Sequence, residues 1–377
     1  MLRVFLAGWV ALMCFCTNAQ DTVDTPNTNK DKIVSKPYVL PWTHEISFHS
    51  DIQQQDYHLI VRFPSGYQES ETGFPVIYIL DGQYHFTLVS GAHGNYAWDG
   101  TIEKAMTVGI TWAGENINVE QMRFQNFTPS ESPAHKPSGG ADTFIRVLKN
   151  EIIPFIEGHY KTNGNRTITG SSLSGLFALY VMTKEPDLFN NIVALSPSLW
   201  WQNREVETLI KTHFAKTDVP AVRLYSARGE YELYGMKSND ALFESLNAQD
   251  HKNLSIRYDI VKGAGHSGVN PIGFAQGMRF VFGKNDLEIP KESKQQMVGD
   301  YISEHQYMPK TTLKSDAIGL YLVDPAMNKI YIRSHSSSEY YINEFNANLR
   351  FSDLKDGQYH TITVSPHNQD DIVFTRQ

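Results

Sequence analysis

Cysteine is nearly absent from this chain of 377 residues. The two cysteines, Cys14 and Cys16, both lie close to the N-terminus. They cannot build a disulfide-linked scaffold, a cysteine zinc site or an iron–sulfur cluster. The 14 histidines include no H-x-x-x-H pair with a third candidate ligand. We therefore expect neither a metal nor an organic cofactor.

Clustered positive charge is also missing. The chain has 33 Lys and Arg against 41 Asp and Glu, a formal net charge of −8, and the cations are scattered. A protein that neutralises nucleic-acid phosphates needs a basic stripe, so we expect no nucleic-acid partner. An acidic surface mainly favours solubility.

Long apolar runs are absent beyond the first twenty residues. Residues 1–19 begin with one cation at Arg3, continue with an apolar run over residues 4–16 and end in small residues at Ala19. This pattern predicts a secretory signal peptide cleaved after Ala19. The apolar run is shorter than the roughly 20 residues that span a bilayer, and neither cysteine follows a small-residue lipobox. We expect a periplasmic or secreted protein with no membrane span, whose mature form has no thiol.

The chain does have enough apolar residues for a packed core, 41% in all. Residues 20–40 are polar and are expected to form a flexible N-terminal segment. Over residues 41–283, short β-rich runs alternate with amphipathic segments that have helical spacing, such as Thr143–Ile156. This alternation predicts an α/β fold with a doubly wound, mostly parallel sheet, in which ligands bind beyond the carboxyl ends of the strands. The expected strands are residues 57–63, 76–80, 106–112, 167–170, 192–195, 222–226 and 256–261.

The pattern changes after Gly283. Residues 284–296 are charged and contain a proline, which predicts a linker. Residues 297–377 contain short alternating segments separated by turn signals such as Asp356-Gly357. They predict a small all-β C-terminal domain, with strands at residues 319–323, 329–333, 340–342, 359–364 and 371–375.

A turn between an expected strand and an expected helix, residues 167–176 (TITGSSLSGL), carries the sharpest chemical signal. In α/β-hydrolases a strained G-x-S-x-G turn pushes a serine Oγ out above the sheet. Gly170 fits the first glycine and Ser172 the nucleophile, whereas Ser174 replaces the second glycine. The alternative is an ordinary turn in which Ser171 or Ser172 caps the helix. We favour Ser172 as a nucleophile.

A serine nucleophile needs a base, and the base needs a carboxylate that orients it. His266 follows a core strand in a glycine-rich loop, residues 262–268 (KGAGHSG). The loop also matches the dinucleotide pattern G-x-G-x-x-G, but it follows the last strand of the unit, and a histidine there would crowd a pyrophosphate. The preceding strand is followed by Glu230 and Glu232, and spacing alone does not choose between them as the acid.

Acyl transfer also requires two backbone N–H donors for the oxyanion. The residue after the nucleophile, Leu173, would supply one. An early buried strand ends in Asp81-Gly82, where a sharp turn would leave the N–H of Gln83 or Tyr84 free to point at the site. A simple Asp-Gly turn is the alternative.

Five separated motifs in order carry a resemblance to a known family: FPVIYILDGQYHF, ITGSSLSGLFALY, ALSPSLWW, GEYE and GHSGV. Together they resemble the esterase D-like branch of the α/β-hydrolases, and most of all the periplasmic siderophore esterases that open ester-linked iron carriers. The resemblance covers about residues 40–283. It implies the α/β-hydrolase fold and ester hydrolysis without a cofactor.

The resemblance also implies roles for individual residues. Ser172 would be the nucleophile and His266 the base. In the family the acid usually falls three residues after the glycine of the GEYE segment, which favours Glu232 over Glu230.

Further residues are implied to contact the substrate. Arg123 lies in RFQNFTP, which resembles the family's R-x-x-D-F-T-P stretch, but Asn126 replaces the aspartate and cannot act as an anion. Trp200 or Trp201 would wall an acyl or aryl pocket, with core packing as the alternative for both.

We therefore expect an exported serine esterase that acts through an acyl-enzyme. Its substrate could be a siderophore ester, a short-chain aryl ester or a carbohydrate acetyl or feruloyl ester. An acyltransferase would use the same triad, with an alcohol in place of water. A binding module on a catalytically dead hydrolase fold is a third reading, and the intact serine and histidine argue against it.

Overall fold

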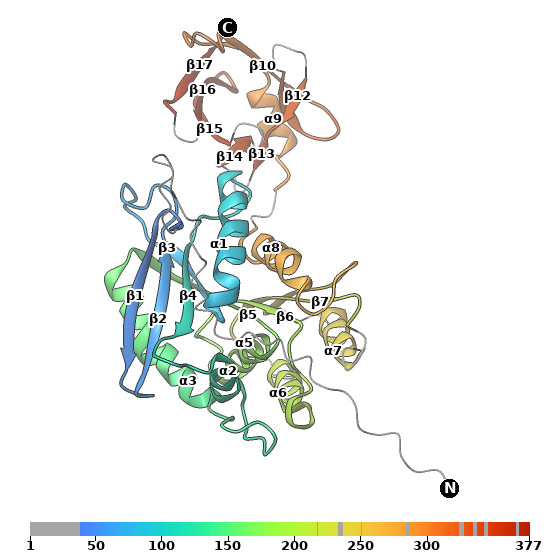
Figure 1. Cartoon of the computed structure of the whole chain (residues 1–377). Coiled ribbons are helices and arrows are strands. Elements are labelled where there is room, and N and C mark those ends of the chain that lie inside the picture. Colours follow the sequence, from blue (N-terminus) through green and yellow to red (C-terminus); the bar gives the residue numbers. More distant parts are fainter. Residues whose placement is uncertain are drawn as a thin grey trace, which may run out of the picture. The chain divides into compact units, whose positions relative to one another are not determined.

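The computed structural model describes residues 38–216, 218–232, 237–249, 251–283, 287–323, 328–334, 338–342, 346–366 and 369–377. The predicted signal peptide, residues 1–19, and nearly all of the predicted flexible segment, residues 20–40, lie outside this part of the chain. The described residues form two sheets, each with its own hydrophobic core (Figure 1).

The first sheet has eight strands in the order β1-β2-β4-β3-β5-β6-β7-β8. Strands β3 to β8 pair in parallel, and β1 and β2 add an antiparallel edge. The bounds are β1 Thr43–Ser50, β2 Gln55–Arg62, β3 Phe74–Ile79, β4 Met106–Trp112, β5 Thr162–Ser171, β6 Asn191–Leu195, β7 Val222–Gly229 and β8 Leu254–Val261. The predicted mostly parallel sheet is confirmed. All seven predicted strands are present, and only the half-exposed edge strand β1 was missed.

Helices cover both faces of this sheet (Figure 1). Helices α1 and α8 pack together on one face, and α2, α3, α5 and α6 lie on the other. The bounds are α1 Gly82–Trp98, α2 Val119–Phe127, α3 Ala141–Val147, α4 Ile153–His159, α5 Leu173–Lys184, α6 Glu205–Phe214, α7 Lys237–Ala248 and α8 Val269–Phe282. The helix expected over residues 143–156 is present as α3 and α4, joined by a π-helical turn at Leu148–Ile152.

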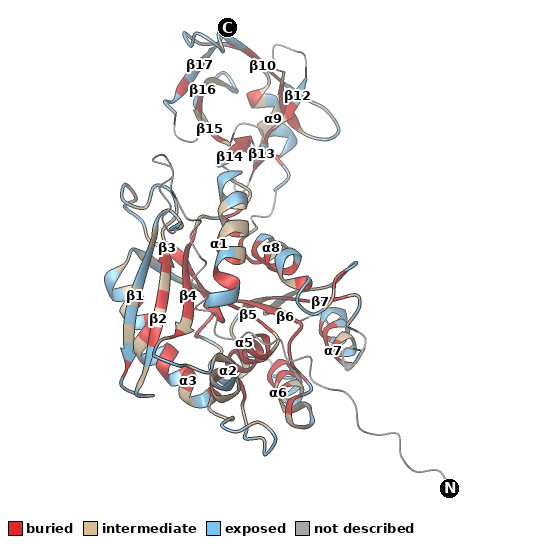
Figure 2. Ribbon diagram, in the orientation of Figure 1, coloured by how far each residue is buried: buried red, intermediate tan, exposed pale blue. Residues whose placement is uncertain are grey.

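Because helices cover both faces, central strands such as β3 and β6 are buried on both faces rather than on alternate residues. Every residue of β6 is buried, as are all but the first of β3 (Figure 2). This packing holds the carboxyl ends of the central strands in fixed positions, and the candidate site lies there.

Two glycines bring α8 close to the sheet. A Cβ at Gly277 would lie 2.6 Å from Val193 Cγ1, and a Cβ at Gly273 would lie 2.8 Å from Leu195 Cδ2. Side chains at these positions would push the helix away from β6. Helix α8 begins directly after the loop that carries His266, so the packing of α8 against the sheet also positions that loop.

We expect Gly277→Ala to lower the free energy of unfolding by about 1–3 kcal/mol, because the added methyl overpacks the helix–sheet interface. Gly91→Ala, in α1, should instead raise it by about 0.5–1 kcal/mol, since a Cβ there meets nothing within 4 Å and alanine favours the helix. Urea unfolding followed by tryptophan fluorescence measures both, because residues 297–377 contain no tryptophan. Equal effects of the two substitutions would contradict the packing argument.

The second sheet has nine antiparallel strands in the order β12-β11-β10-β9-β17-β16-β15-β14-β13. The bounds are β9 Gly299–Ile302, β10 Lys310–Ser315, β11 Leu320–Val323, β12 Lys329–Tyr331, β13 Arg333–Ser334, β14 Tyr340–Ile342, β15 Ala347–Lys355, β16 Gln358–Pro366 and β17 Ile372–Arg376. The predicted all-β appendage is confirmed, although β9, β10 and β15 were not predicted.

The described part of the predicted linker, residues 284–296, contains regular structure. Helix α9, Lys291–Met297, begins there, and Ile289 and Met297 are buried in the core of the second sheet. Pro290 stands just before the first turn of α9, where a helix tolerates proline. Charge and proline content indicated a linker, but two apolar side chains anchor the segment. The other domain limits stay predictions.

No helix in the described part of the chain combines the length and apolar character needed to cross a membrane.

Candidate active site

The candidate residues follow the carboxyl ends of four neighbouring parallel strands, at one edge of the first sheet. Ser172 directly follows β5, Ser196 and Ser198 follow β6, Glu232 follows β7 and His266 follows β8. Carboxyl ends of parallel strands meet at the same edge, where α/β sheets bind their ligands. Two hydrogen bonds from the β6 loop connect the set, one to Ser172 and one to Glu232.

Ser172 occupies a strained turn. Its backbone has φ 61° and ψ −116°, a region that residues other than glycine rarely adopt. Its N–H donates to the carbonyl of Leu195 at 2.9 Å, and its carbonyl accepts from the N–H groups of Leu176 and Ser198. The turn is therefore held from both sides, by the end of β6 and by the first turn of α5. This is the local geometry of a nucleophile elbow.

Glycines allow the strand and the helix of this turn to approach. A Cβ at Gly170 would lie 2.6 Å from the carbonyl oxygen of Ser174, and one at Gly175 would lie 2.9 Å from the carbonyl oxygen of Leu195. The second close approach occurs at Gly175, one residue beyond the second glycine of the usual motif. Ser174 can therefore occupy the motif position without disturbing the turn.

The hydroxyl of Ser174 joins a buried ion pair. It donates to Asp81 Oδ2 at 2.7 Å, and Arg123 Nε donates to both oxygens of the same carboxylate at 3.0 and 3.1 Å. Asp81 is fully buried and follows β3 in a left-handed conformation, with φ 51°. Its carboxylate therefore ties the end of β3 to α2 and to α5.

Arg123 also donates to Glu120 at 3.1 Å. Burial lowers the pKa of the Arg123 guanidinium, but the carboxylates of Asp81 and Glu120 raise it by more, so the group stays charged. In the structure the guanidinium of Arg123 supports Asp81, and its predicted role in binding substrate stays a prediction.

The first turns of α1 and α5 contain the backbone N–H groups that are candidates for the oxyanion hole. The N–H of Tyr84 donates to the carbonyl of Asp81 at 2.9 Å, which removes it as an oxyanion donor and leaves Gln83 of the two candidates. Leu173 is the first residue of α5, and the first N–H groups of a helix have no partner within it. Among the described residues, neither the Gln83 nor the Leu173 N–H donates to a protein acceptor.

The carboxylate of Glu232 contacts the imidazole of His266. Glu232 Oε2 lies 2.7 Å from His266 Nδ1, while Oε1 accepts from Ser196 Oγ at 2.6 Å and from the Gly229 N–H at 2.7 Å. The side chain of Glu232 is 7% exposed. Burial raises the pKa of this carboxyl, but the hydrogen bonds from His266, Ser196 and Gly229 together lower it below its ordinary value. It is therefore an anion at neutral pH, suited to orient a histidine.

Glu230, the other carboxylate left open by the sequence, bonds elsewhere. It accepts from Lys262 Nζ at 3.0 Å and from the Gly263 N–H at 2.9 Å, and its side chain is exposed. The hydrogen bond from the Gly263 N–H lowers the pKa of this carboxyl most, and the hydrogen bond from Lys262 lowers it further. Of the two glutamates, Glu232 is the one that contacts His266.

The loop that carries His266 is packed against the end of β7. A Cβ at Gly229 would lie 2.5 Å from the carbonyl oxygen of Ala264, and the Tyr231 N–H donates to that same oxygen at 3.0 Å. The imidazole itself is half exposed, and within the described residues it makes no hydrogen bond to Ser172. The partner of Ser172 Oγ is Ser198 Oγ at 3.3 Å. Catalytic hydrogen bonds are often unformed before substrate binds.

The two tryptophans have different environments. Trp201 is 1% exposed, donates from Nε1 to the carbonyl of Ser130 at 3.2 Å and packs near Phe124. Its burial matches core packing, the alternative to a pocket wall. Trp200 is 50% exposed, and its role as a pocket wall stays a prediction.

Asn126, which replaces the family's aspartate, is fully buried. Its Nδ2 donates to the hydroxyl of Tyr57 at 3.3 Å, and its Oδ1 accepts from Gln53 at 2.9 Å. The residue joins α2 to the antiparallel edge of the sheet, so its amide has a structural function.

Sequence reasoning missed the link from Ser196 to Glu232 and treated Asp81 only as a turn residue. A signal for Asp81 was present, since a carboxylate ending a wholly apolar strand must find a buried partner. The partners themselves come from distant segments and could not be identified from spacing.

These features define the class. A mostly parallel sheet, a strained serine turn after a central strand and a Glu–His pair after the last two strands are those of an α/β-hydrolase. A family model described as "Putative esterase" matches residues 50–270. The chain belongs to this esterase family and is a hydrolase that acts on esters.

Several similar proteins have names that state an esterase or hydrolase activity. The ferri-bacillibactin esterase BesA of Bacillus subtilis is 28% identical over 268 residues, covering 65% of this chain and 91% of the relative. A siderophore triacetylfusarinine C esterase of Aspergillus fumigatus is 24% identical, covering 59% and 79%. The crystal structure of an IroE-like serine hydrolase from Shewanella oneidensis superposes with a TM-score of 0.58 at 25% identity, covering 64% and 80%.

Removing the buried negative charge should strongly destabilise the first sheet and its helices. We expect Asp81→Asn to lower the free energy of unfolding by about 3 kcal/mol or more, because the Arg123 guanidinium loses its buried counter-charge. Glu120→Gln is the matched control, since it removes the exposed partner of the same guanidinium and should cost less than about 1 kcal/mol. Urea unfolding followed by tryptophan fluorescence distinguishes the two. Similar losses would show that Asp81 does not hold this region together.

Proposed function

We propose that the protein is a serine esterase whose catalytic triad is Ser172, His266 and Glu232. The observation that carries the proposal is the 2.7 Å contact between buried Glu232 Oε2 and His266 Nδ1, on the same sheet edge as the strained Ser172 turn. Membership of the esterase family supports the reaction class. The surroundings of each of these residues suit its proposed role in the triad.

In the proposed acylation step, Ser172 Oγ attacks the carbonyl carbon of the ester while His266 Nε2 takes its proton. Glu232 accepts the Nδ1–H bond, keeps Nε2 available as the base and stabilises the imidazolium that forms. The negative oxygen of the tetrahedral intermediate accepts hydrogen bonds from the N–H groups of Leu173 and Gln83. The imidazolium then donates its proton to the leaving alcohol, and the acyl-enzyme remains.

In the deacylation step, His266 takes a proton from water, and the resulting hydroxide attacks the acyl carbonyl. Collapse of the second tetrahedral intermediate releases the carboxylic acid, and the proton on His266 returns to Ser172 Oγ. Before acylation the Ser172 hydroxyl must turn from Ser198 towards the imidazole, a side-chain rotation with a small barrier.

For the substrate we propose a siderophore-type ester. Two relatives are named as esterases of this kind, a ferri-bacillibactin esterase and a siderophore triacetylfusarinine C esterase. The half-exposed indole of Trp200, which begins the turn before α6, is proposed to contact an aryl or acyl group of the substrate. Residues 1–19 support export to the periplasm or the medium.

The triad assignment predicts unequal effects of two isosteric changes in one loop. Glu232→Gln should lower kcat/KM by about 10²- to 10⁴-fold, because an amide neither orients His266 in the required tautomer nor stabilises its cation. Glu230→Gln should stay within about 3-fold, since the partners of that carboxylate among the described residues are Lys262 and Gly263. Initial rates on an activated aryl ester measure both.

A fluorophosphonate provides the control for this assignment. Intact mass should rise by one adduct in the wild type and not in Ser172→Ala, and peptide mapping should place the adduct at residue 172. A dominant loss at Glu230, or a folded wild type that does not react, would overturn the triad.

The substrate proposal is tested by comparing esters of different size. We expect hydrolysis of a ferric catecholate trilactone with a higher kcat/KM than that of p-nitrophenyl acetate. Trp200→Ala should raise KM for the aryl substrate by about 3- to 10-fold, as expected for the loss of one aromatic contact. Trp98→Ala is the matched control, because that exposed indole lies at the far end of α1 from Gln83.

Two outcomes would contradict the siderophore assignment: a trilactone rate no higher than that of the small ester, or equal effects of the two tryptophan substitutions. Transfer of the acyl group to an added alcohol in preference to water would identify an acyltransferase instead.

A further inference from the structure

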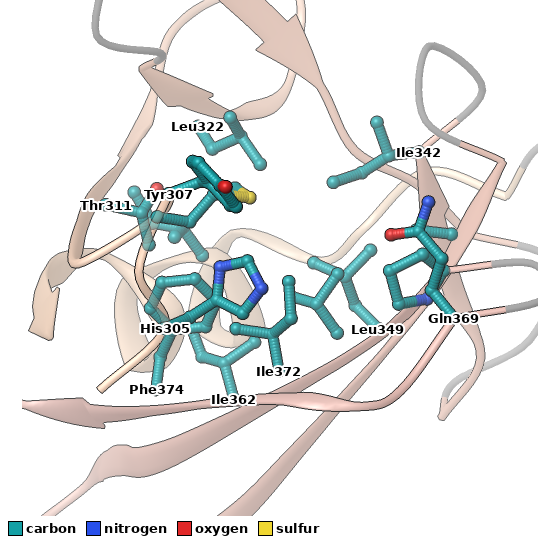
Figure 3. A pocket seen from close by; sticks show the side chains of 15 residues that line it. His305, Tyr307, Thr311, Leu322, Ile342, Leu349, Ile362, Gln369, Ile372 and Phe374 are labelled. Atoms are coloured by element: carbon teal, nitrogen blue, oxygen red, sulfur yellow. The ribbon is translucent and has the colours of Figure 1, made fainter. Parts of the chain in front are cut away.

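The core of the second sheet contains a cavity of about 450 Å³ (Figure 3). All of its lining residues lie between His305 and Phe374, so the cavity belongs to this sheet alone. Protein interiors contain few voids larger than a water molecule. The apolar surface that lines a cavity of this size would be covered by an apolar occupant, and its removal from water is favourable.

The described part of the wall is mainly aliphatic. Among the described residues that line the cavity there is no Lys, Arg, Asp or Glu. Most of the wall consists of buried aliphatic side chains, namely those of Leu313, Leu322, Ile342, Ala347, Leu349, Ile362, Val364 and Ile372. Such a lining favours an uncharged apolar molecule, because an ion would lose its hydration without gaining a counter-charge.

Polar groups lie at two places on the lining. Figure 3 shows His305, Tyr307 and Thr311 towards one side of the cavity and Gln369 at the opposite side. Tyr307 is 77% exposed, so the first side is open to solvent. A molecule entering there would pass the polar groups with its apolar part directed to the aliphatic wall.

One of these polar groups is unsatisfied. Thr311 is 7% exposed, and its Oγ1 has no hydrogen-bond partner among the described residues. A buried hydroxyl without a partner is unfavourable, typically by about 1–3 kcal/mol, and a ligand oxygen in the cavity would remove that penalty. Thr311 therefore indicates where the single polar group of a ligand would lie.

We propose that this cavity is a binding site for an uncharged, mainly aliphatic molecule with one hydroxyl or carbonyl group that hydrogen-bonds to Thr311. At about 30 Å³ per water-sized group, the volume holds a molecule of roughly 15 non-hydrogen atoms, which corresponds to a medium-chain alcohol. The proposal does not depend on the esterase assignment, since no residue of the candidate active site lines the cavity.

Titration of the full-length protein with the neutral fluorophore N-phenyl-1-naphthylamine tests the proposal. We expect saturable binding with a Kd on the order of 10 μM, a usual value for an apolar ligand of this size. Dodecan-1-ol should displace the fluorophore at least 10-fold more effectively than dodecyltrimethylammonium, whose charge finds no partner in the lining. The absence of saturable binding, or equal displacement by the two amphiphiles, would overturn the proposal.

Ala347→Phe places a ring into the cavity from the start of β15 and should weaken fluorophore binding at least 10-fold. Val373→Phe is the matched control, because Val373 is half exposed on β17 and does not line the cavity. Both variants should keep wild-type ester hydrolysis, which excludes binding in the active site as the source of the signal. Retained fluorophore binding in a folded Ala347→Phe variant, or equal losses in both, would place the site elsewhere.

Thr311→Val is a gentler change that tests the polar contact by itself. It preserves the shape of the side chain and removes the hydroxyl, so we expect fluorophore binding to be unchanged and the affinity for dodecan-1-ol to fall by about 5-fold. An unchanged affinity for the alcohol would contradict the assigned hydrogen bond. Circular dichroism of each variant confirms that the β structure is retained.

Discussion

The buried carboxylate of Asp81 joins the end of β3 to α2 and α5, and so connects the two segments that carry the proposed oxyanion donors. It accepts hydrogen bonds from Arg123 of α2 and Ser174 of α5, and it directly precedes α1, which carries the proposed oxyanion donor Gln83. A buried charge with such partners is strongly destabilising to break, because the remaining ion would stay unpaired. The positions of Leu173 and Gln83 thus depend on one buried ion pair.

A second constraint comes from the parallel sheet. Four adjacent strands end at one edge of the sheet. Hydrogen bonds join Ser172 to Ser198 and Ser196 to Glu232, and Glu232 contacts His266. The Glu–His pair is already formed, whereas Ser172 is bonded to Ser198 in the resting state. The proposed anion and base therefore already contact each other, whereas the Ser172 hydroxyl must leave Ser198 for the proposed reaction.

Much of the fold could be predicted from local patterns, because several buried strands are apolar runs and segments such as residues 143–156 have apolar residues at helical spacing. The same patterns failed where polar residues form regular structure, as in the edge strand β1, and where two apolar residues anchor a charged segment, as in α9. Trp201 and Arg123 were assigned to the substrate because their motif was recognisable. Their burial and partners are tertiary properties that a motif does not contain.

The sequence by itself determined the class of the protein. The order of a serine turn, two glutamates and a histidine after successive strands specifies an α/β-hydrolase chemistry, because strand order and the position of each loop follow from the chain. Only the tertiary structure decided which glutamate contacts His266, since Glu230 and Glu232 are two residues apart and differ in the groups that surround them. It alone revealed the Asp81 ion pair and the C-terminal cavity, because both are made by residues far apart in the chain that meet only after folding.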